Sequence, residues 1–91
     1  MRILCIINPL DYIQEIKVIE DNSVVETYEV SLKDLPDIVL DKCVELHLKE
    51  IGIKLFSANL EFASGIISMI NEKNKMYLIN DLKVEVLKWS I

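Results

Sequence analysis

The stretch ILCIINPL, Ile3–Leu10, begins with five unbroken apolar residues and stops at Asn8-Pro9. An apolar run that fills both faces of a strand is typical of a central strand covered by helices on both sides. Proline has no N–H to donate to a sheet ladder, so Pro9 is expected to end the strand. We therefore predict a buried first strand at Arg2–Ile7. Asn8 would follow at its carboxyl end, where an α/β enzyme would place a catalytic carboxylate, or would be an ordinary turn residue at the end of the strand.

Two half-polar segments come next, Tyr12–Ile19 and Val24–Val30, each alternating apolar and polar residues. They flank the turn-forming residues Asp21-Asn22-Ser23. Alternation on both sides of an Asp-Asn turn predicts a β-hairpin.

The remaining sequence predicts two helices and two strands. Ser31 or Asp34 would cap a helix at Leu35–Ile51, with Gly52 just past its end. This helix has two apolar stripes, one more than a helix covered on one side needs, so a second element should cover it. The other expected elements are a strand at Ile53–Phe56, a helix at Leu60–Lys73 capped by Asn59, and a strand from Leu82 in which Val84 and Val86 face the core. The expected fold is α/β, in the order β-β-β-α-β-α-β, with helices packed on a mixed sheet of about five strands.

Composition narrows the class of protein. Ninety-one residues, 52% of them hydrophobic and only two of them glycine, indicate one folded domain spanning 1–91. Fifteen acidic residues against ten basic ones give a net charge of −5, which repels phosphate backbones and anionic lipid. Nucleic acid and membrane are therefore disfavoured as partners. The sequence shows no signal peptide and no apolar run long enough to span a membrane, so a cytoplasmic location is expected.

Cysteine, histidine and glycine offer few sites for chemistry. Cys5 and Cys43 fall in apolar patterns without a metal-ligand spacing, which favours buried, reduced thiols. Cys43 and His47 are four residues apart and could pair a thiolate with a base on one helix, although no third group is evident to orient the imidazole. Gly65, beside Ala63 and Ser64, predicts a close helix contact. P-loop, dinucleotide-binding, zinc and EF-hand motifs do not occur.

The order of elements resembles the opening of the ribonuclease H-like fold, which includes the RuvC-type resolvases. ILCIINP stands in the place of that family's apolar strand ending in Asp-Pro-Gly, which puts Asn8 where the family has its first metal-binding Asp. IKLFSAN would be the fourth strand, with Ser57 and Asn59 as candidates for its second carboxylate position. Because two-metal chemistry needs converging carboxylates and neither asparagine has a charge, the resemblance implies a member without the nuclease site. The alternative is a reduced, Mg²⁺-dependent nuclease that uses Asp11 or Glu61 instead.

Two groups of residues are candidates for binding a partner. Asp34, Asp37, Asp41 and Glu45 are spaced by three, four and four residues, which places them on one face of the expected helix. They would meet a basic protein surface, or form a solvated face whose first carboxylates stabilise the helix N-terminus. One helical row does not converge as a cation site requires, so we expect no metal and no cofactor. On the final strand, Leu87 and Trp89 would bind a partner strand or a second copy, or would cover the far face of the sheet.

These observations predict a small, acidic, intracellular and non-catalytic protein. Its expected partner is a protein with a basic surface or a second copy of itself, as a homodimer. The composition suits an accessory protein of an AT-rich bacterium or its phage. A purely structural subunit is the third hypothesis, after the reduced nuclease.

Overall fold

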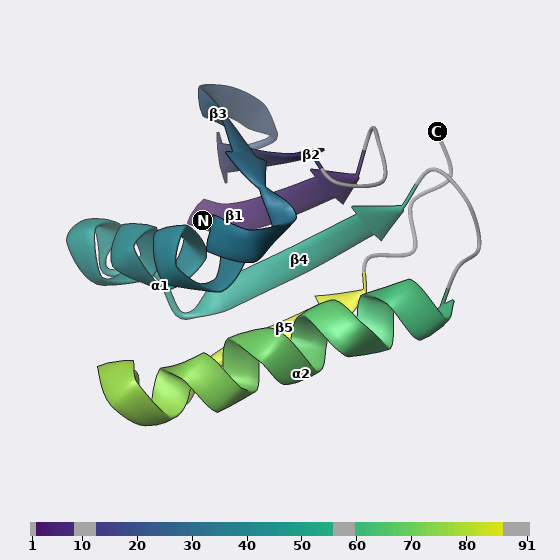
Figure 1. Ribbon diagram of the computed structural model, residues 1–91. Helices are drawn as coiled ribbons and strands as arrows, with labels where there is room; N and C mark the ends of the chain where they lie inside the picture. The colour runs from purple at the N-terminus through teal and green to yellow at the C-terminus, as the bar shows by residue number, and fades with distance from the viewer. Residues whose placement is uncertain (1, 9–12, 56–59, 87–91) are drawn as a thin grey trace.

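A computed structural model of the protein describes residues 2–8, 13–55 and 60–86 (Figure 1). Within these ranges the chain forms five strands, one 3₁₀ turn and two α-helices. In chain order they are β1 (Arg2–Asn8), β2 (Ile13–Glu20), β3 (Ser23–Ser31), η1 (Leu32–Asp34), α1 (Leu35–Leu46), β4 (Glu50–Leu55), α2 (Leu60–Tyr77) and β5 (Lys83–Val86). The α/β class and the predicted order of elements are both confirmed.

The five strands form one mixed sheet in the order β3-β2-β1-β4-β5. β1 pairs antiparallel with β2 and parallel with β4, so it lies at the centre of the sheet. β2 pairs antiparallel with β3, and β4 pairs parallel with β5. β3 and β5 are therefore the two edge strands.

The hairpin between β2 and β3 closes on two residues. Asp21 and Asn22 have φ values of 51° and 69°, and Glu20 pairs with Ser23 on either side of them. Two successive positive φ values give the type I′ geometry that matches strand twist, and Asp and Asn tolerate this conformation. The predicted turn is confirmed, with Ser23 already in the strand.

Both helices pack on the same face of the sheet. α1 connects β3 to β4 and α2 connects β4 to β5, and both crossovers join parallel strands while moving in the same direction across the sheet. Because such crossovers are right-handed, two of them running in one direction place their helices on one side. Buried residues of both helices accordingly join the sheet in a single apolar cluster.

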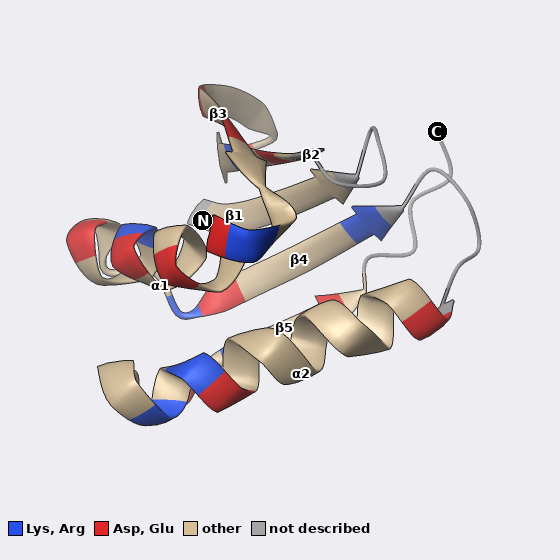
Figure 2. Cartoon of the chain, viewed as in Figure 1, with Lys and Arg blue, Asp and Glu red and all other residues tan. Residues whose placement is uncertain are grey.

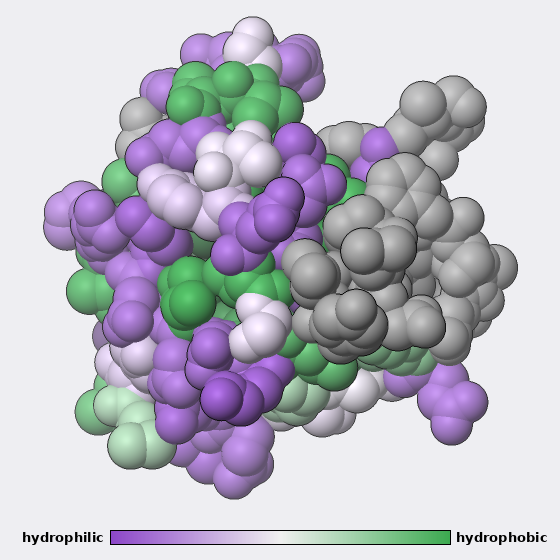
Figure 3. All heavy atoms as spheres, turned by 45° about the horizontal axis from the view of Figure 1, so that its top comes forward, coloured by the Kyte–Doolittle hydropathy of each residue, from purple (hydrophilic) through white to green (hydrophobic). Residues whose placement is uncertain are grey.

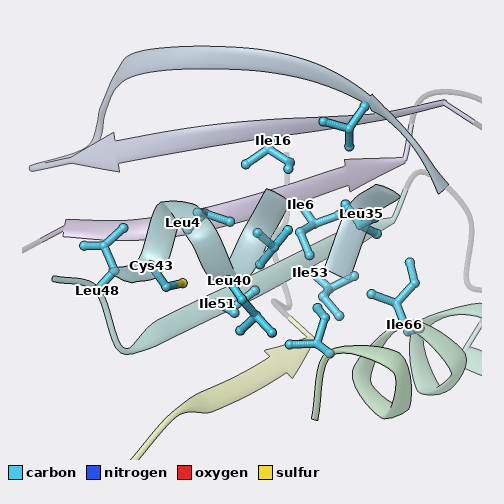
Figure 4. Close-up of a cluster of buried hydrophobic side chains, with 14 residues drawn as sticks. Leu4, Ile6, Ile16, Leu35, Leu40, Cys43, Leu48, Ile51, Ile53 and Ile66 are labelled. Atoms are coloured by element: carbon cyan, nitrogen blue, oxygen red, sulfur yellow. The ribbon is translucent and has the colours of Figure 1, made fainter. Parts of the chain in front are cut away.

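That cluster is the core of the molecule (Figure 4). Leu4 and Ile6 of β1 are fully buried, as are Ile51 and Ile53 directly beside them on β4. The helices contribute Leu35, Val39, Leu40, Cys43, Ala63, Ile66 and Ile70. On the opposite face of β1, Cys5 and Ile7 are also buried, although no described helix covers that face. The prediction that β1 is buried on both faces is correct, but helices account for only one of them.

Helix α1 ends earlier than the sequence predicts. It stops at Leu46, and His47 takes a left-handed conformation with φ 56° and ψ 44°. The N–H of Leu48 then donates to the carbonyl of Cys43 at 2.8 Å, and that of His47 to Val44 at 3.4 Å, which is the Schellman pattern. Gly52 lies within β4 and does not end the helix, so its predicted role as a helix stop is wrong.

Helix α2 extends past the predicted end at Lys73 to Tyr77. Asn74 closes it, because its side-chain amide donates to the carbonyl of Ile79 at 3.1 Å and accepts from the N–H of Ile79 at 3.0 Å. Gly65 is exposed, and a Cβ placed on it would meet nothing within 4 Å. The predicted close helix contact at Gly65 is therefore wrong.

No helix in the described ranges combines the length and the apolar character needed to cross a membrane.

Candidate functional site

The four acidic residues predicted to share one helix face do lie along η1 and α1, but each has a partner within the chain. At the start of the row, the Ser31 hydroxyl donates to Asp34 at 3.0 Å. At its end, Lys42 Nζ lies 3.1 Å from Glu45 Oε2. Both of these contacts are local and exposed, so the two carboxylates remain accessible to a partner.

Asp37 and Asp41, in the middle of the row, face helix α2 instead. Lys73 Nζ lies 3.2 Å from Asp37 Oδ1. The Tyr77 hydroxyl donates to Asp41 Oδ1 at 2.7 Å and contacts the Asp37 carbonyl oxygen at 3.3 Å. These two carboxylates therefore hold α1 against α2, a role that spacing within one helix cannot reveal.

The hydroxyl of Tyr77 is the most strongly perturbed group in this contact. The hydrogen bond to Asp41, with desolvation and the negative charges of Asp41 and Asp37, raises the pKa of Tyr77 to about 12. A phenol that donates to a carboxylate is stabilised in its protonated form. Tyr77 lies beyond the end that the sequence predicts for this helix, so its contact with α1 was not predictable from the helical spacing.

Negative charge is concentrated in one half of the molecule (Figure 2). Residues 13–47, which form β2, β3, η1 and α1, carry nine acidic and three basic side chains, a net charge of −6. Residues 48–86, which form β4, α2 and β5, carry five of each. We call residues 13–47 the acidic half. The protein's net charge therefore reflects one half of the fold and not an even distribution.

Within the acidic half, Glu15 and Glu29 are directly opposite each other in the register of β2 and β3. Like charges in this position destabilise a sheet. Lys17 Nζ lies 3.6 Å from Glu15 Oε2, and its positive charge offsets part of the repulsion between Glu15 and Glu29. Glu29 is exposed and makes no ion pair in the part of the chain that the structure describes. It is a carboxylate available to an external cation.

On the helix-covered face of the same hairpin, Tyr28 contacts both a carboxylate and a lysine. Its hydroxyl donates to Glu26 Oε1 at 2.5 Å, and Lys42 of α1 lies 4.5 Å from the centre of its ring. The contact with Tyr28, together with Glu45, raises the pKa of Lys42 above its ordinary value. Tyr28 thereby connects the edge strand β3 to α1.

The two thiols are buried and unbonded, as predicted. Burial raises the pKa of both Cys5 and Cys43 to about 11, and at Cys5 the charges of Lys54 and Lys17 oppose part of this effect. Thiols with such a pKa are protonated at neutral pH and are poor nucleophiles. His47 is exposed at the residue that closes α1. The geometry gives no support to a thiolate–base pair of Cys43 and His47.

The positions implied by the ribonuclease H-like resemblance are only partly described. Asn8 pairs with Leu55, so the carboxyl ends of β1 and β4 lie side by side. Glu61 is exposed in the first turn of α2. Asp11, Ser57 and Asn59 fall outside the described residues, as do Leu87 and Trp89 of the other candidate surface. The described residues contain no group of three or more His, Cys, Asp or Glu side chains placed to hold a metal ion.

Figure 3 shows apolar side chains among hydrophilic ones on one face of the molecule. Among the described residues, the exposed large apolar side chains are Val24 and Val25 of β3, Val44 of α1, Met69 and Met76 of α2, and Leu78. Val24 and Val25, at the start of β3, are about half exposed, at 52% and 49%. Met69 and Met76 of α2 line a groove of about 430 Å³ that also borders Pro36 of α1. The rim of the groove carries both acidic and basic side chains, so it does not select a partner by charge.

Comparison of the sequence with protein-family models gave no match, and comparison with curated proteins gave none.

Proposed function

We propose that this protein is a non-catalytic binding protein whose acidic half engages a protein partner with a basic surface. The observation that carries the proposal is the net charge of −6 on residues 13–47 beside a neutral second half. A surface of one sign attracts partners of the opposite sign and orients them during encounter. The charge distribution thus supports binding by the half of the fold that β2, β3, η1 and α1 form.

The accessible carboxylates in this half support the same proposal. Glu29 has no ion pair in the described chain, and Asp34 and Glu45 make only local, exposed contacts. Exposed pairs of this kind contribute about 0–1 kcal/mol, so a partner can replace them at little cost. Asp37 and Asp41 are poorer candidates because their contacts with α2 would have to be broken.

The non-catalytic part of the proposal rests on residue chemistry. Asn8 supplies an amide where a nuclease of the resembled family would need a charged metal ligand. Both thiols have pKa values of about 11, which removes the described cysteines as nucleophiles at neutral pH. The ribonuclease H-like resemblance, the homodimer and the bacterial or phage origin stay predictions.

The test is a comparison of two charge-reversed proteins as baits for binding partners. Glu29→Lys with Glu45→Lys reverses two exposed carboxylates of the acidic half, while Glu72→Lys with Glu85→Lys makes the same change of charge in the neutral half. We expect the wild type and the Glu72/Glu85 variant to retain the same basic partner, and the Glu29/Glu45 variant to lose it. Binding should weaken at least tenfold between 50 and 300 mM salt, because screening removes the attraction. A partner retained equally by both variants would contradict the proposal.

A further inference from the structure

We propose that the outer edge of β3 binds an extended, basic segment of the partner as a sixth strand of the sheet. This inference rests on the proposed function and specifies how the partner is held. It commits to one kind of occupant, a segment in β conformation with two basic side chains three residues apart. Backbone hydrogen bonds would supply affinity and the two charges would supply selectivity.

The side of Ser23–Ser31 that faces away from β2, which we call the β3 edge, is available for pairing with another strand. β3 uses its inner side to pair with β2 from Ile13↔Ser31 to Glu20↔Ser23, and no other described strand pairs with it. An edge strand leaves the N–H and C=O groups of every second residue pointing outward, which is a template for another strand.

β3 lacks two common forms of edge protection, and its one irregularity is a β-bulge near its start, where the register shift between Val18 and Ile19 leaves Val25 as an extra residue. β3 has nine residues, SVVETYEVS, where an average strand has about five or six. It contains neither lysine nor proline, the residues that most often block an edge. The other edge strand, β5, begins with Lys83 and is described over only four residues. Over the described residues β3 is the longer edge, and from Glu26 to Ser31 it pairs with β2 without interruption and carries no lysine or proline.

The two carboxylates of β3, Glu26 and Glu29, lie on opposite faces of the sheet. Glu26 pairs with Val18 and lies on the helix-covered face, whereas Glu29 pairs with Glu15 on the opposite face. An added strand alternates its side chains in the same way, so basic residues three apart would lie on opposite faces and reach one carboxylate each. The basic residue beside Glu29 would also offset the unfavourable Glu15–Glu29 pair.

Charge also decides between a partner segment and a second copy. Joining two β3 edges would bring Glu26 and Glu29 of both copies to one seam and would face two surfaces of net charge −6 toward each other. Like charges across an interface oppose association. The edge therefore favours a basic strand over its own duplicate.

The experiment uses three labelled nine-residue peptides of alternating Thr and Val and the full-length protein. One peptide has Lys at positions 4 and 7, the second has Lys at positions 4 and 6, and the third has Glu at positions 4 and 7. Fluorescence anisotropy measures affinity, and amide hydrogen exchange followed by NMR measures protection of β3. The protein variants are Glu26→Gln with Glu29→Gln and, as a matched control, Glu72→Gln with Glu85→Gln.

We expect the 4/7 Lys peptide to bind at least tenfold more tightly than the Glu peptide and more tightly than the 4/6 Lys peptide. It should slow exchange at alternate residues of β3 at least tenfold. The Glu26/Glu29 variant should lose this preference, and the Glu72/Glu85 variant should keep it. Equal binding of the three peptides, no binding, or binding without protection of β3 would overturn the inference. Concentration-dependent protection of β3 without peptide would also overturn it, in favour of a second copy.

These outcomes separate the two proposals. A basic partner that depends on the acidic half but leaves the β3 amides unprotected would refute strand addition and leave the proposed function standing. Failure to find any partner that depends on the acidic half would refute the proposed function, whatever the peptides do at the edge.

Discussion

At the scale of single residues, His47 occupies a backbone conformation that suits glycine better than histidine. Its φ of 56° closes α1, and a non-glycine residue in the left-handed region costs about 1 kcal/mol or more. We expect His47→Gly to raise the free energy of unfolding by about 1 kcal/mol, because the Schellman hydrogen bonds stay intact. Urea denaturation measures the change, and His47→Ala, which keeps the unfavourable φ, is the control. A glycine variant no more stable than the alanine variant would contradict this assignment of the helix end.

Gly65 is the opposite of His47: it is a glycine at a position whose surroundings do not require one. It lies inside α2, is exposed, and has open space where a Cβ would go. Gly65→Ala should therefore stabilise the protein by about 1 kcal/mol through helix propensity and reduced freedom of the unfolded chain. Ser64→Ala on the same helix is the matched control, with an expected gain on the order of 0.5 kcal/mol. A loss of stability in Gly65→Ala would show that the position is closely packed after all.

Residues with special backbone geometry differ in how well sequence predicts them. Asp21 and Asn22 were predictable because both residue types tolerate a positive φ and alternating strands flank them. His47 was not, since apolar residues at Leu48 and Ile51 continue the helical spacing past the true end of α1. Leu48 is apolar because it is buried in the core just after the helix cap, and Ile51 because it is fully buried in β4.

At the scale of elements, the contact between α1 and α2 depends on the hydroxyl of Tyr77. Its 2.7 Å hydrogen bond to Asp41 should contribute about 1 kcal/mol, less than the roughly 1.5–3 kcal/mol of a bond to a charged group, because the contact is exposed to water. Tyr77→Phe should lower the free energy of unfolding by that amount at pH 7. Asp41→Asn, which keeps an acceptor without the charge, should cost less.

The same bond has a defined pH dependence. The pKa of Tyr77 is raised to about 12 in the folded state from an ordinary value near 10, so folding favours the protonated phenol. Its stabilisation is complete below pH 10 and is lost as the pH rises from 10 to 12. Urea denaturation at pH 8, 10 and 11.5 should show the wild type and Tyr77→Phe converging in stability. A constant difference across this range would mean that the hydroxyl does not donate to Asp41.

The candidate site was predictable only up to the scale of one helix. The spacing of Asp34, Asp37, Asp41 and Glu45 correctly placed them along η1 and α1. It could not show that Lys73 and Tyr77, more than a helix and a strand away in the chain, take up the two central carboxylates. Nor could it single out Glu29, whose exposure follows from the pairing of β2 with β3.

At the scale of the whole molecule, the direction in which the chain crosses the sheet explains why both described helices lie on one face. The sequence predicted the strands and helices, and β1 as a strand buried on both faces. Periodicity in β1 cannot distinguish cover by helices from cover by other parts of the chain. The placement of both helices on one face follows from the strand order β3-β2-β1-β4-β5, which depends on long-range pairing. Cys5 and Ile7 are consequently buried on the face without a described helix.

The two thiols test the burial of both faces of the sheet, since Cys43 belongs to the buried side of α1 in the core and Cys5 lies on the opposite face of β1. Burial raises the pKa of each from 9.0 to about 11, so the folded state favours the neutral thiol. The resulting stabilisation is complete below about pH 9 and is lost between pH 9 and 11. We expect the free energy of unfolding to fall steeply across this range in the wild type.

The variant Cys5→Ala with Cys43→Ala should start from a lower stability at pH 8, because two buried side chains are shortened. Its stability should then change much less between pH 8.5 and 10.5 than that of the wild type, because no thiol remains to ionise on unfolding. Each single variant should remove part of the slope, and the Cys5 variant tests the face that no described helix covers. An unchanged slope for Cys5→Ala would mean that solvent reaches Cys5 and that this face of the sheet is open, whereas a reduced slope requires β1 to be closed on both sides.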